Sequence, residues 1–423
     1  MQNELDKSSL SDEQLLREYY SRYGGYWECP GLLDFCYLVN PYFTRSKIID
    51  EMQANFRVLV TEYPAGMAVN SRLASQCWNV RPEYILPGNG AAELIKALMD
   101  TLEGNIGIVR PTFEEYPNRL APERVVTFVP QHPMFRYDAD DLIAYFTEHS
   151  VDTLLLINPD NPSGNFIPIE GVHRLAAWCE ERGIRFVLDE SFVDFSVGFA
   201  ENTFLANALL ERYPHLCVIK SISKSYGIPG LRLGILCSSD TGFVARLKKE
   251  VSIWNINSFA EFFMQIYPKY REDYAQACRQ FIQTREDFEA QLREIPFIRV
   301  MPSQANYFFL EVLPPYRPKQ LCALLLRKYN ILASACLAKK GIAPRQVYAH
   351  CRAQPWRQRK THRSLPRIGA ITPLSLPIIY IRSRKSKSHQ PTTQKQYRTW
   401  HKSKPPRDSS LTRVICSISA RSE

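Results

Sequence analysis

The sequence lacks several features that would assign a protein to a class at once. No apolar run reaches the roughly 18 residues that a membrane-spanning helix needs, and no basic opening segment leads into an apolar core. The 11 cysteines include no CxxC pair and their number is odd, which is typical of free thiols in a reducing compartment. We therefore expect a cytoplasmic protein without a signal peptide or a membrane anchor.

Acidic residues are scarce in one part of the chain only. Residues 347–423 contain 17 lysines and arginines but 2 acidic residues, whereas the rest of the chain contains 36 against 41. The net charge of +10 therefore comes entirely from the C-terminal segment. Its composition, rich in Arg, Lys, Ser, Pro and Gln, predicts a disordered basic tail. The mildly acidic body gives no reason to expect a nucleic-acid partner.

Between about residues 63 and 239, short apolar runs alternate with longer amphipathic segments. Runs such as Val151–Ile157 are typical of buried parallel strands, and segments such as Ala91–Leu102 are typical of the helices between them. The alternation predicts an α/β architecture, with helices on both faces of a mostly parallel sheet. We expect an N-terminal segment that contributes to a small domain, then a large domain, the small domain itself and the tail, at residues 1–60, 61–245, 246–346 and 347–423.

The most specific segment is SISKSYGIPGLRLG, residues 221–234, which follows an apolar run. A lysine at the end of a strand can form a Schiff base with an aldehyde cofactor when its surroundings lower its pKa. Lys224 occupies that position. The hydroxyls of Ser221 and Ser223 and the guanidinium of Arg232 could hold a phosphate group beside it. Together these residues predict a binding site for pyridoxal 5'-phosphate.

Four further segments place suitable residues at the ends of predicted strands. Gly90 and Ala91 open a helix, where free backbone N–H groups can bind phosphate. Phe113 could lie flat against a cofactor ring, and the amide of Asn161 could reach a ring hydroxyl. Asp189 could keep a pyridine nitrogen protonated. Each feature alone has an ordinary structural explanation, but the carboxyl ends of parallel strands share one edge of a sheet, where ligands bind.

The segments GNGAAELI, NPDNPSG, LDESFVDF and SISKSYGIPGLRLG carry a family resemblance. Over about residues 30–346 the chain is similar to the class I/II aminotransferases of fold type I. Within that family it most resembles the branch of histidinol-phosphate aminotransferases and threonine-phosphate decarboxylases. The resemblance implies a three-layer α/β/α large domain with a mostly parallel sheet, a smaller α+β domain, and pyridoxal 5'-phosphate as the cofactor.

The resemblance also implies a role for each predicted site residue. Lys224 would hold the cofactor covalently and then move the substrate's α-proton, while Asp189 would pair with the pyridine nitrogen. Asn161 would hydrogen-bond the ring oxygen, and Phe113 would stack on the ring. Tyr63 would reach the phosphate of the neighbouring subunit, which implies a homodimer. The phosphate would be held by the backbone amides of Gly90 and Ala91 and by Ser221, Ser223 and Arg232. The resemblance implies no metal.

The sequence leaves the reaction and its substrate open. Where many aminotransferases have a tyrosine near the ring oxygen, this chain has Phe192, as the decarboxylases of the family tend to have. Our first interpretation is an aminotransferase that moves an amino group between an amino acid or amine, with or without a phosphate group, and a 2-oxo acid. The alternatives are a decarboxylase of a phosphorylated amino acid and an inactive remnant that still binds the cofactor.

The tail departs from the family pattern. Members bind the substrate carboxylate through an arginine in a strand that reads RIAVR, but this chain continues with VYAHCRAQPW from residue 347. Codons permitted for residues 347–364, read one base later, can encode YMRIAVRNPGDNEKLIAA. We hypothesise that one extra base after the codon of Gln346 shifted the frame. The shift would remove the carboxylate arginine and the last strand and helix of the small domain, unless Arg345 or Arg352 replaces that arginine.

Overall fold

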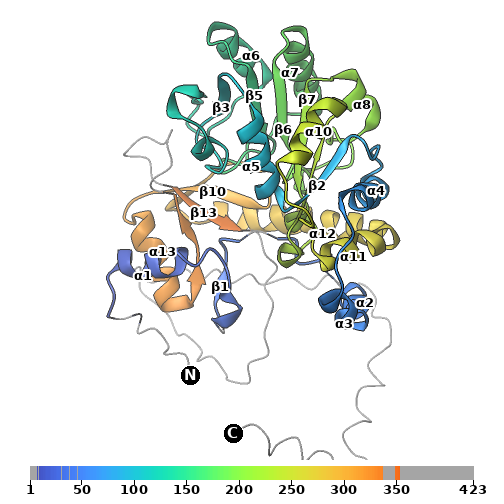
Figure 1. Cartoon of the computed structure of the whole chain (residues 1–423). Helices are drawn as coiled ribbons and strands as arrows, with labels where there is room; N and C mark the ends of the chain where they lie inside the picture. The colour runs from blue at the N-terminus through green and yellow to red at the C-terminus, as the bar shows by residue number, and fades with distance from the viewer. Residues whose placement is uncertain are drawn as a thin grey trace, which may run out of the picture. The chain divides into compact units, whose positions relative to one another are not determined.

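A seven-stranded sheet forms the centre of the larger part of the protein (Figure 1). The computed structural model describes residue 7 and residues 9–29, 31–37, 39–44, 46–336 and 348–352. The strands lie in the order β2-β8-β7-β6-β5-β3-β4, and only β8 runs antiparallel to its neighbours. Their bounds are β2 Ile85–Asn89, β3 Ile106–Val109, β4 Val125–Phe128, β5 Thr153–Ile157, β6 Arg185–Asp189, β7 Leu216–Ser221 and β8 Leu233–Cys237.

Successive residues of the central strands face two separate cores, because side chains alternate between the faces of a sheet. Leu154 and Leu156 belong to one hydrophobic cluster, and Leu155 and Ile157 belong to the other. Helices α5 (Ala91–Thr101) and α10 (Thr241–Lys249) cover the second face. The first face is covered by α4 (Met67–Trp78), α6 (Ala139–Glu148), α7 (Ile169–Glu181), α8 (Asn207–Arg212) and α11 (Ser258–Ile266). The predicted α/β fold with a mostly parallel sheet is confirmed.

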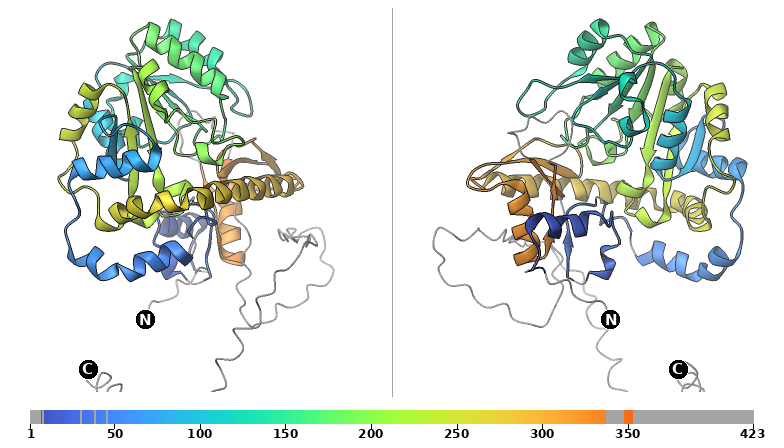
Figure 2. Two further views of the ribbon diagram at one scale, coloured as in Figure 1. Left: turned by 90° about the vertical axis from the view of Figure 1, so that its right-hand side faces the viewer. Right: turned by 60° about the vertical axis from the view of Figure 1, so that its left-hand side comes forward.

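The smaller part has an antiparallel sheet with the order β12-β13-β10-β9, and a parallel pair formed by β1 and β11. The N-terminal segment joins this part, because β1 pairs with β11 and α1 packs on α13. Figure 2 shows the long helix α12 running along the large sheet domain toward the small sheet. The bounds are α1 Asp12–Tyr20, β1 Leu33–Asp34, α12 Arg271–Arg293, β9 Ile298–Val300, β10 Tyr307–Val312, α13 Pro318–Tyr329, β11 Ile331–Leu332, β12 Ser334–Ala335 and β13 Tyr348–Arg352.

Three further helices lie outside these layers or beside the candidate site: α2 (Ser46–Ala54), α3 (Phe56–Thr61) and α9 (Ile222–Ser225). Among the described residues, no helix combines the length and the apolar character needed to cross a membrane.

The C-terminal segment differs from the sequence prediction at its start. We expected an irregular tail from residue 347, but β13 spans Tyr348–Arg352 and pairs antiparallel with β10 and β12. The physical reason is that β10 presents backbone N–H and C=O groups along its edge, and any extended segment can pair with them. The remainder of the predicted tail, from residue 353, lies outside the described residues.

Candidate active site

The topology of the large sheet brings most of the predicted site residues to one edge. Gly90 follows β2, Asn161 follows β5, and Asp189 ends β6. Lys224 lies in α9, which directly follows β7. Because β8 runs antiparallel, Arg232 at its start lies at the same edge as the carboxyl ends of the other strands. Residues separated by about 140 positions in the sequence are therefore neighbours along one edge of the sheet.

Lys224 lies near two aromatic rings. Its Nζ is 4.3 Å from the ring centroid of Phe192 and 5.6 Å from that of Phe113. Burial lowers the pKa of Lys224, and the positive charge of Arg232 lowers it further, while the carboxylate of Asp189 acts in the opposite direction. A lowered pKa increases the fraction of neutral amine, which is the nucleophilic form. The lysine is therefore prepared to react with a carbonyl group.

Asp189 is held by two hydrogen bonds in a site where only 4% of its surface is exposed. The hydroxyl of Tyr116 donates to Oδ2 over 2.7 Å, and the backbone N–H of Ser191 donates to Oδ1 over 2.8 Å. Burial and the charge of Asp189 raise the pKa of Tyr116 well above its usual value, so the phenol remains a donor. Tyr116 was not among the residues predicted from the sequence, although its position three residues after Phe113 places it in the same loop.

A small cradle lies where α5 begins against β8. Gly90 has a positive φ of 75°, and a Cβ atom there would lie 2.7 Å from Nη2 of Arg232. A Cβ on Gly234 would lie 2.5 Å from the backbone nitrogen of Ala91. Gly90 is required by its backbone conformation and leaves room for the guanidinium, whereas Gly234 is required by close approach and lets β8 pack against the helix start.

Ser223, in α9 at the same edge of the sheet, offers a further hydroxyl to a phosphate. Its Oγ is buried and has no hydrogen-bond partner within the described part of the chain. A buried hydroxyl without a partner costs free energy, and a phosphate oxygen would satisfy it. Ser221 is also buried, and its backbone N–H donates to Oγ of Ser191 over 3.0 Å. The donors of α5, Ser223 and Arg232 thus fit the phosphate group of the expected cofactor.

The loop that carries Asn161 is braced from two sides. The amide of Asn158 forms two hydrogen bonds of 2.9 Å with the backbone of Ile167. The hydroxyl of Tyr307, in β10, donates to the backbone oxygen of Asp160 over 2.7 Å. The ring of Tyr307 also contacts Phe192, with 5.0 Å between the centroids. The small sheet therefore supports the loop that places Asn161 at the edge of the large sheet.

Two predictions concern residues away from this cluster. Tyr63 is 82% exposed, and its ring lies 4.9 Å from that of Trp254, so it is not a member of the cluster within its own chain. Its predicted role in a neighbouring subunit stays a prediction. The register of β13 places Arg352 opposite Tyr307 in β10. The position at which the shifted reading frame would place the carboxylate arginine, near residues 353–354, lies outside the described residues.

Comparison with known proteins identifies the family. Residues 65–341 match the model of the family described as aminotransferase class I and II. The chain is 34% identical over 337 residues to a CMP-5'-(3-aminopropyl)phosphonate synthase from Streptomyces rubellomurinus, covering 79% of this chain and 53% of that protein. It is 30% identical over 323 residues to an L-serine phosphate decarboxylase from Sulfurospirillum multivorans, covering 73% of this chain and 81% of that protein.

A solved structure of a decarboxylase from Sulfurospirillum multivorans has a TM-score of 0.70 and 26% identity, covering 81% of this chain and 95% of that chain. Other relatives include histidinol-phosphate aminotransferases and a threonine-phosphate decarboxylase, as the resemblance implied. The chain spans about half the length of the first two curated relatives, 53% and 50%. With its fold of type I, the chain belongs to the class I and II aminotransferase family.

Proposed function

We propose that this chain is a decarboxylase that uses pyridoxal 5'-phosphate and acts on an amino acid carrying a phosphate or phosphonate group. The observation that carries the proposal is the buried ring of Phe192, 4.3 Å from Nζ of Lys224. The names of two relatives, at 34% and 30% identity, support a phosphonate or phosphate group in the substrate. Our first interpretation from the sequence, an aminotransferase, becomes the second candidate, supported by relatives such as a histidinol-phosphate aminotransferase at 26% identity.

The cofactor of this family supplies an electron sink for the charge that bond cleavage leaves on the substrate's α-carbon. In the proposal, Lys224 holds the cofactor and delivers a proton to the carbon that has lost its carboxyl group. Asp189 keeps the pyridine nitrogen protonated, because its two donors hold the carboxylate in place. Phe113 covers the ring and Asn161 hydrogen-bonds the ring oxygen. The donors that would hold the phosphate are Gly90, Ala91, Ser221, Ser223 and Arg232.

An apolar ring beside the reacting amine favours loss of the carboxyl group. Phe192 contributes no hydroxyl and excludes water from the side of Lys224 that it covers. A carboxylate placed in such surroundings loses hydration, whereas the charge in the transition state is spread over a larger group. An apolar wall therefore lowers the barrier to loss of carbon dioxide more than it lowers the barrier to moving a proton between two carbon atoms, as transamination requires.

We also propose a homodimer that forms through an exposed apolar surface. This surface consists of side chains on α3, on the residues that follow it and on the segment before α11, namely Phe56, Val58, Val60, Tyr63, Ile253 and Trp254. The two parts of the surface are in contact: the rings of Tyr63 and Trp254 lie 4.9 Å apart, and Phe56 in α3 lies 5.9 Å from Phe259 in α11. Large exposed apolar patches mark interaction sites. Tyr63 belongs to this surface, which supports its predicted role in the partner's site.

The two reactions are separated by their products. The full chain is loaded with pyridoxal 5'-phosphate and incubated with O-phosphoserine or O-phosphothreonine, without any 2-oxo acid. A decarboxylase releases carbon dioxide over many turnovers, and Lys224→Ala abolishes the release. If pyridoxamine phosphate instead accumulates to one equivalent without carbon dioxide, the chain is an aminotransferase and the first proposal is wrong.

A further inference from the structure

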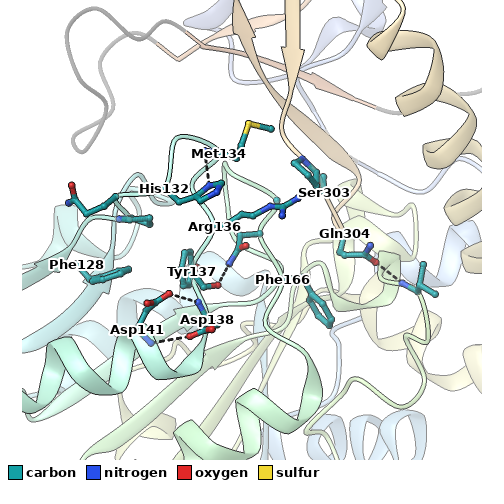
Figure 3. Close-up of a pocket in the computed structure, with 16 residues that line it drawn as sticks. Phe128, His132, Met134, Arg136, Tyr137, Asp138, Asp141, Phe166, Ser303 and Gln304 are labelled. Carbon is teal, nitrogen blue, oxygen red and sulfur yellow. Dashed lines mark hydrogen bonds between the residues drawn. The ribbon is translucent and has the colours of Figure 1, made fainter.

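A cavity of about 930 Å³ lies between the large sheet domain and the segment before β10 (Figure 3). Its volume is in the range of small-molecule sites. One wall is formed by residues 128–141 and 164–166, and the other by residues 302–304. The lining adjoins the loop that carries Asn161, since the backbone N–H of Gln304 donates to the oxygen of Gly164 over 3.1 Å. The cavity therefore lies behind a loop of the candidate active site, and Lys224 does not line it.

One side of the cavity offers donors to an anion. Figure 3 shows the guanidinium of Arg136 extending toward Ser303, and this arginine is exposed. The ring of His132 accepts a hydrogen bond at Nδ1 from the backbone N–H of Met134 over 3.1 Å, so Nε2 carries the proton and can donate. Phe135, which directly precedes Arg136, packs on Phe309 with 5.5 Å between centroids and anchors this loop to β10.

The other side of the cavity offers acceptors. Asp138 and Asp141 lie at the start of α6, on the far side of Tyr137 from Arg136 (Figure 3). Oδ1 of Asp138 accepts from the backbone of residues 140 and 141, and Oδ2 of Asp141 accepts from the backbone of Asp138. Each carboxylate thus caps the helix with one oxygen, and its second oxygen can still accept a hydrogen bond. A ligand that is purely anionic would be repelled by these groups.

Aromatic side chains supply a surface for a flat ring. Phe128 and Phe166 line the cavity and are partly buried. Phe128 is held in place by edge contacts to Tyr137, at 6.0 Å, and to Tyr145, at 5.3 Å. Aromatic rings held in this way provide stacking surfaces for planar ligands. The cavity therefore combines an anion-binding side, an acceptor side and an apolar wall.

We propose that the cavity binds a nucleoside monophosphate group, either as the distal part of a substrate or as a separate molecule. The phosphate binds Arg136 and His132, which give it charge-assisted hydrogen bonds. Hydroxyl or amino groups of the nucleoside donate to Asp138 and Asp141. The base packs on the aromatic wall formed by Phe128 and Phe166. The cavity would thus extend the substrate range of the proposed decarboxylase, but binding itself does not depend on that reaction.

Calorimetric titration of the full chain with cytidine 5'-monophosphate tests the proposal. We expect saturable binding that weakens at least about tenfold in Arg136→Gln, because a charge-assisted contact is lost. Arg317→Gln, which changes an exposed arginine outside the cavity, should bind as the unchanged protein does. Phe166→Ala should weaken binding of the nucleotide more than binding of ribose 5-phosphate. Equal affinity of both arginine variants, or no binding, would overturn the proposal.

Two further probes define the ligand. If inorganic phosphate binds as tightly as the nucleotide, the cavity is an anion site only and the proposed class is wrong. Repeating the titration with saturating O-phosphoserine shows whether the nucleotide group belongs to a substrate or to a separate ligand. Weakened nucleotide binding indicates that the cavity holds the distal part of a substrate. Unchanged binding indicates a separate ligand. The loading of Lys224 with cofactor is measured independently, so failure of the proposed function is distinguishable from failure of this inference.

Discussion

The hydroxyl of Tyr116 donates a hydrogen bond of 2.7 Å to Oδ2 of Asp189, and both side chains are buried. The two residues lie 73 positions apart in the sequence, one after β3 and one at the end of β6. Because parallel strands end at the same edge, the loop after β3 can support a carboxylate on another strand. The contact holds the predicted partner of the pyridine nitrogen in place before any cofactor binds.

Tyr116→Phe should therefore destabilise the protein without cofactor by about 1–3 kcal/mol, since a buried charged acceptor loses a donor. The measurement is urea unfolding at neutral pH. Tyr145→Phe is the matched control, because its hydroxyl donates over 2.8 Å to the neutral backbone oxygen of Thr127 and should contribute only about 0.5–1.5 kcal/mol. Equal losses in both variants would show that the charge of Asp189 does not strengthen the contact.

Gly90→Ala should weaken the binding of pyridoxal 5'-phosphate at least about tenfold, because the new Cβ would displace the guanidinium of Arg232 from the cradle. Fluorescence titration of the protein with the cofactor measures the affinity. Gly183→Ala is the control: Gly183 also has a positive φ, of 67°, but a Cβ there has no neighbour within 4 Å. Both variants carry a backbone cost on the order of 1–3 kcal/mol, because each glycine has a positive φ, and only the first should lose cofactor affinity. If both variants lose the same cofactor affinity, the loss comes from the backbone conformation alone and not from displacement of Arg232.

Val60→Asp should convert the proposed dimer to a monomer, because it places a charge within the exposed apolar surface around α3. Sedimentation velocity at micromolar concentration measures the change. Val197→Asp is matched in exposure, 55% against 57% for Val60, but lies elsewhere and should leave the dimer intact. A monomeric unchanged protein, or a dimeric Val60→Asp variant, would contradict the proposed interface.

Lys224 and Asp189 were predictable because each lies in a short segment whose residue types serve one chemistry, and because strand order places both at one edge. Tyr116 was not predictable to the same degree, since its partner depends on how a loop folds over a distant strand. The environment of Lys224, near Phe113 and Phe192, likewise depends on packing between separate strands. The strand β13 was missed because its pairing with β10 uses backbone groups, which leave little trace in the choice of residues.

Glu190 should make stability fall as the pH rises. Burial raises the pKa of Glu190 to about 7, although Lys220 acts against this rise. The folded protein therefore keeps a proton that the unfolded chain releases near its ordinary pKa of 4.5, so raising the pH from about 4.5 to about 7 favours unfolding. The effect is on the order of 3 kcal/mol, by the free energy that corresponds to one pKa unit.

Glu190→Gln cannot release this proton and should lack the corresponding slope. Unfolding by urea at several pH values, with the difference between the two proteins plotted against pH, isolates the contribution of Glu190. Lys220 and Asp194, which form a buried ion pair of 2.7 Å nearby, remain in both proteins. If the difference stays constant across this range, Glu190 is ionised in the folded state throughout and the prediction fails.

The lysine that holds the cofactor can be identified directly. The full chain is incubated with pyridoxal 5'-phosphate, reduced with sodium borohydride and analysed by peptide mass spectrometry. We expect one equivalent of reduced cofactor on Lys224 and none on Lys220, whose amine is engaged with Asp194. Lys224→Ala should remain unlabelled. Full labelling of Lys224→Ala, or labelling at a different lysine in the unchanged protein, would show that Lys224 does not hold the cofactor.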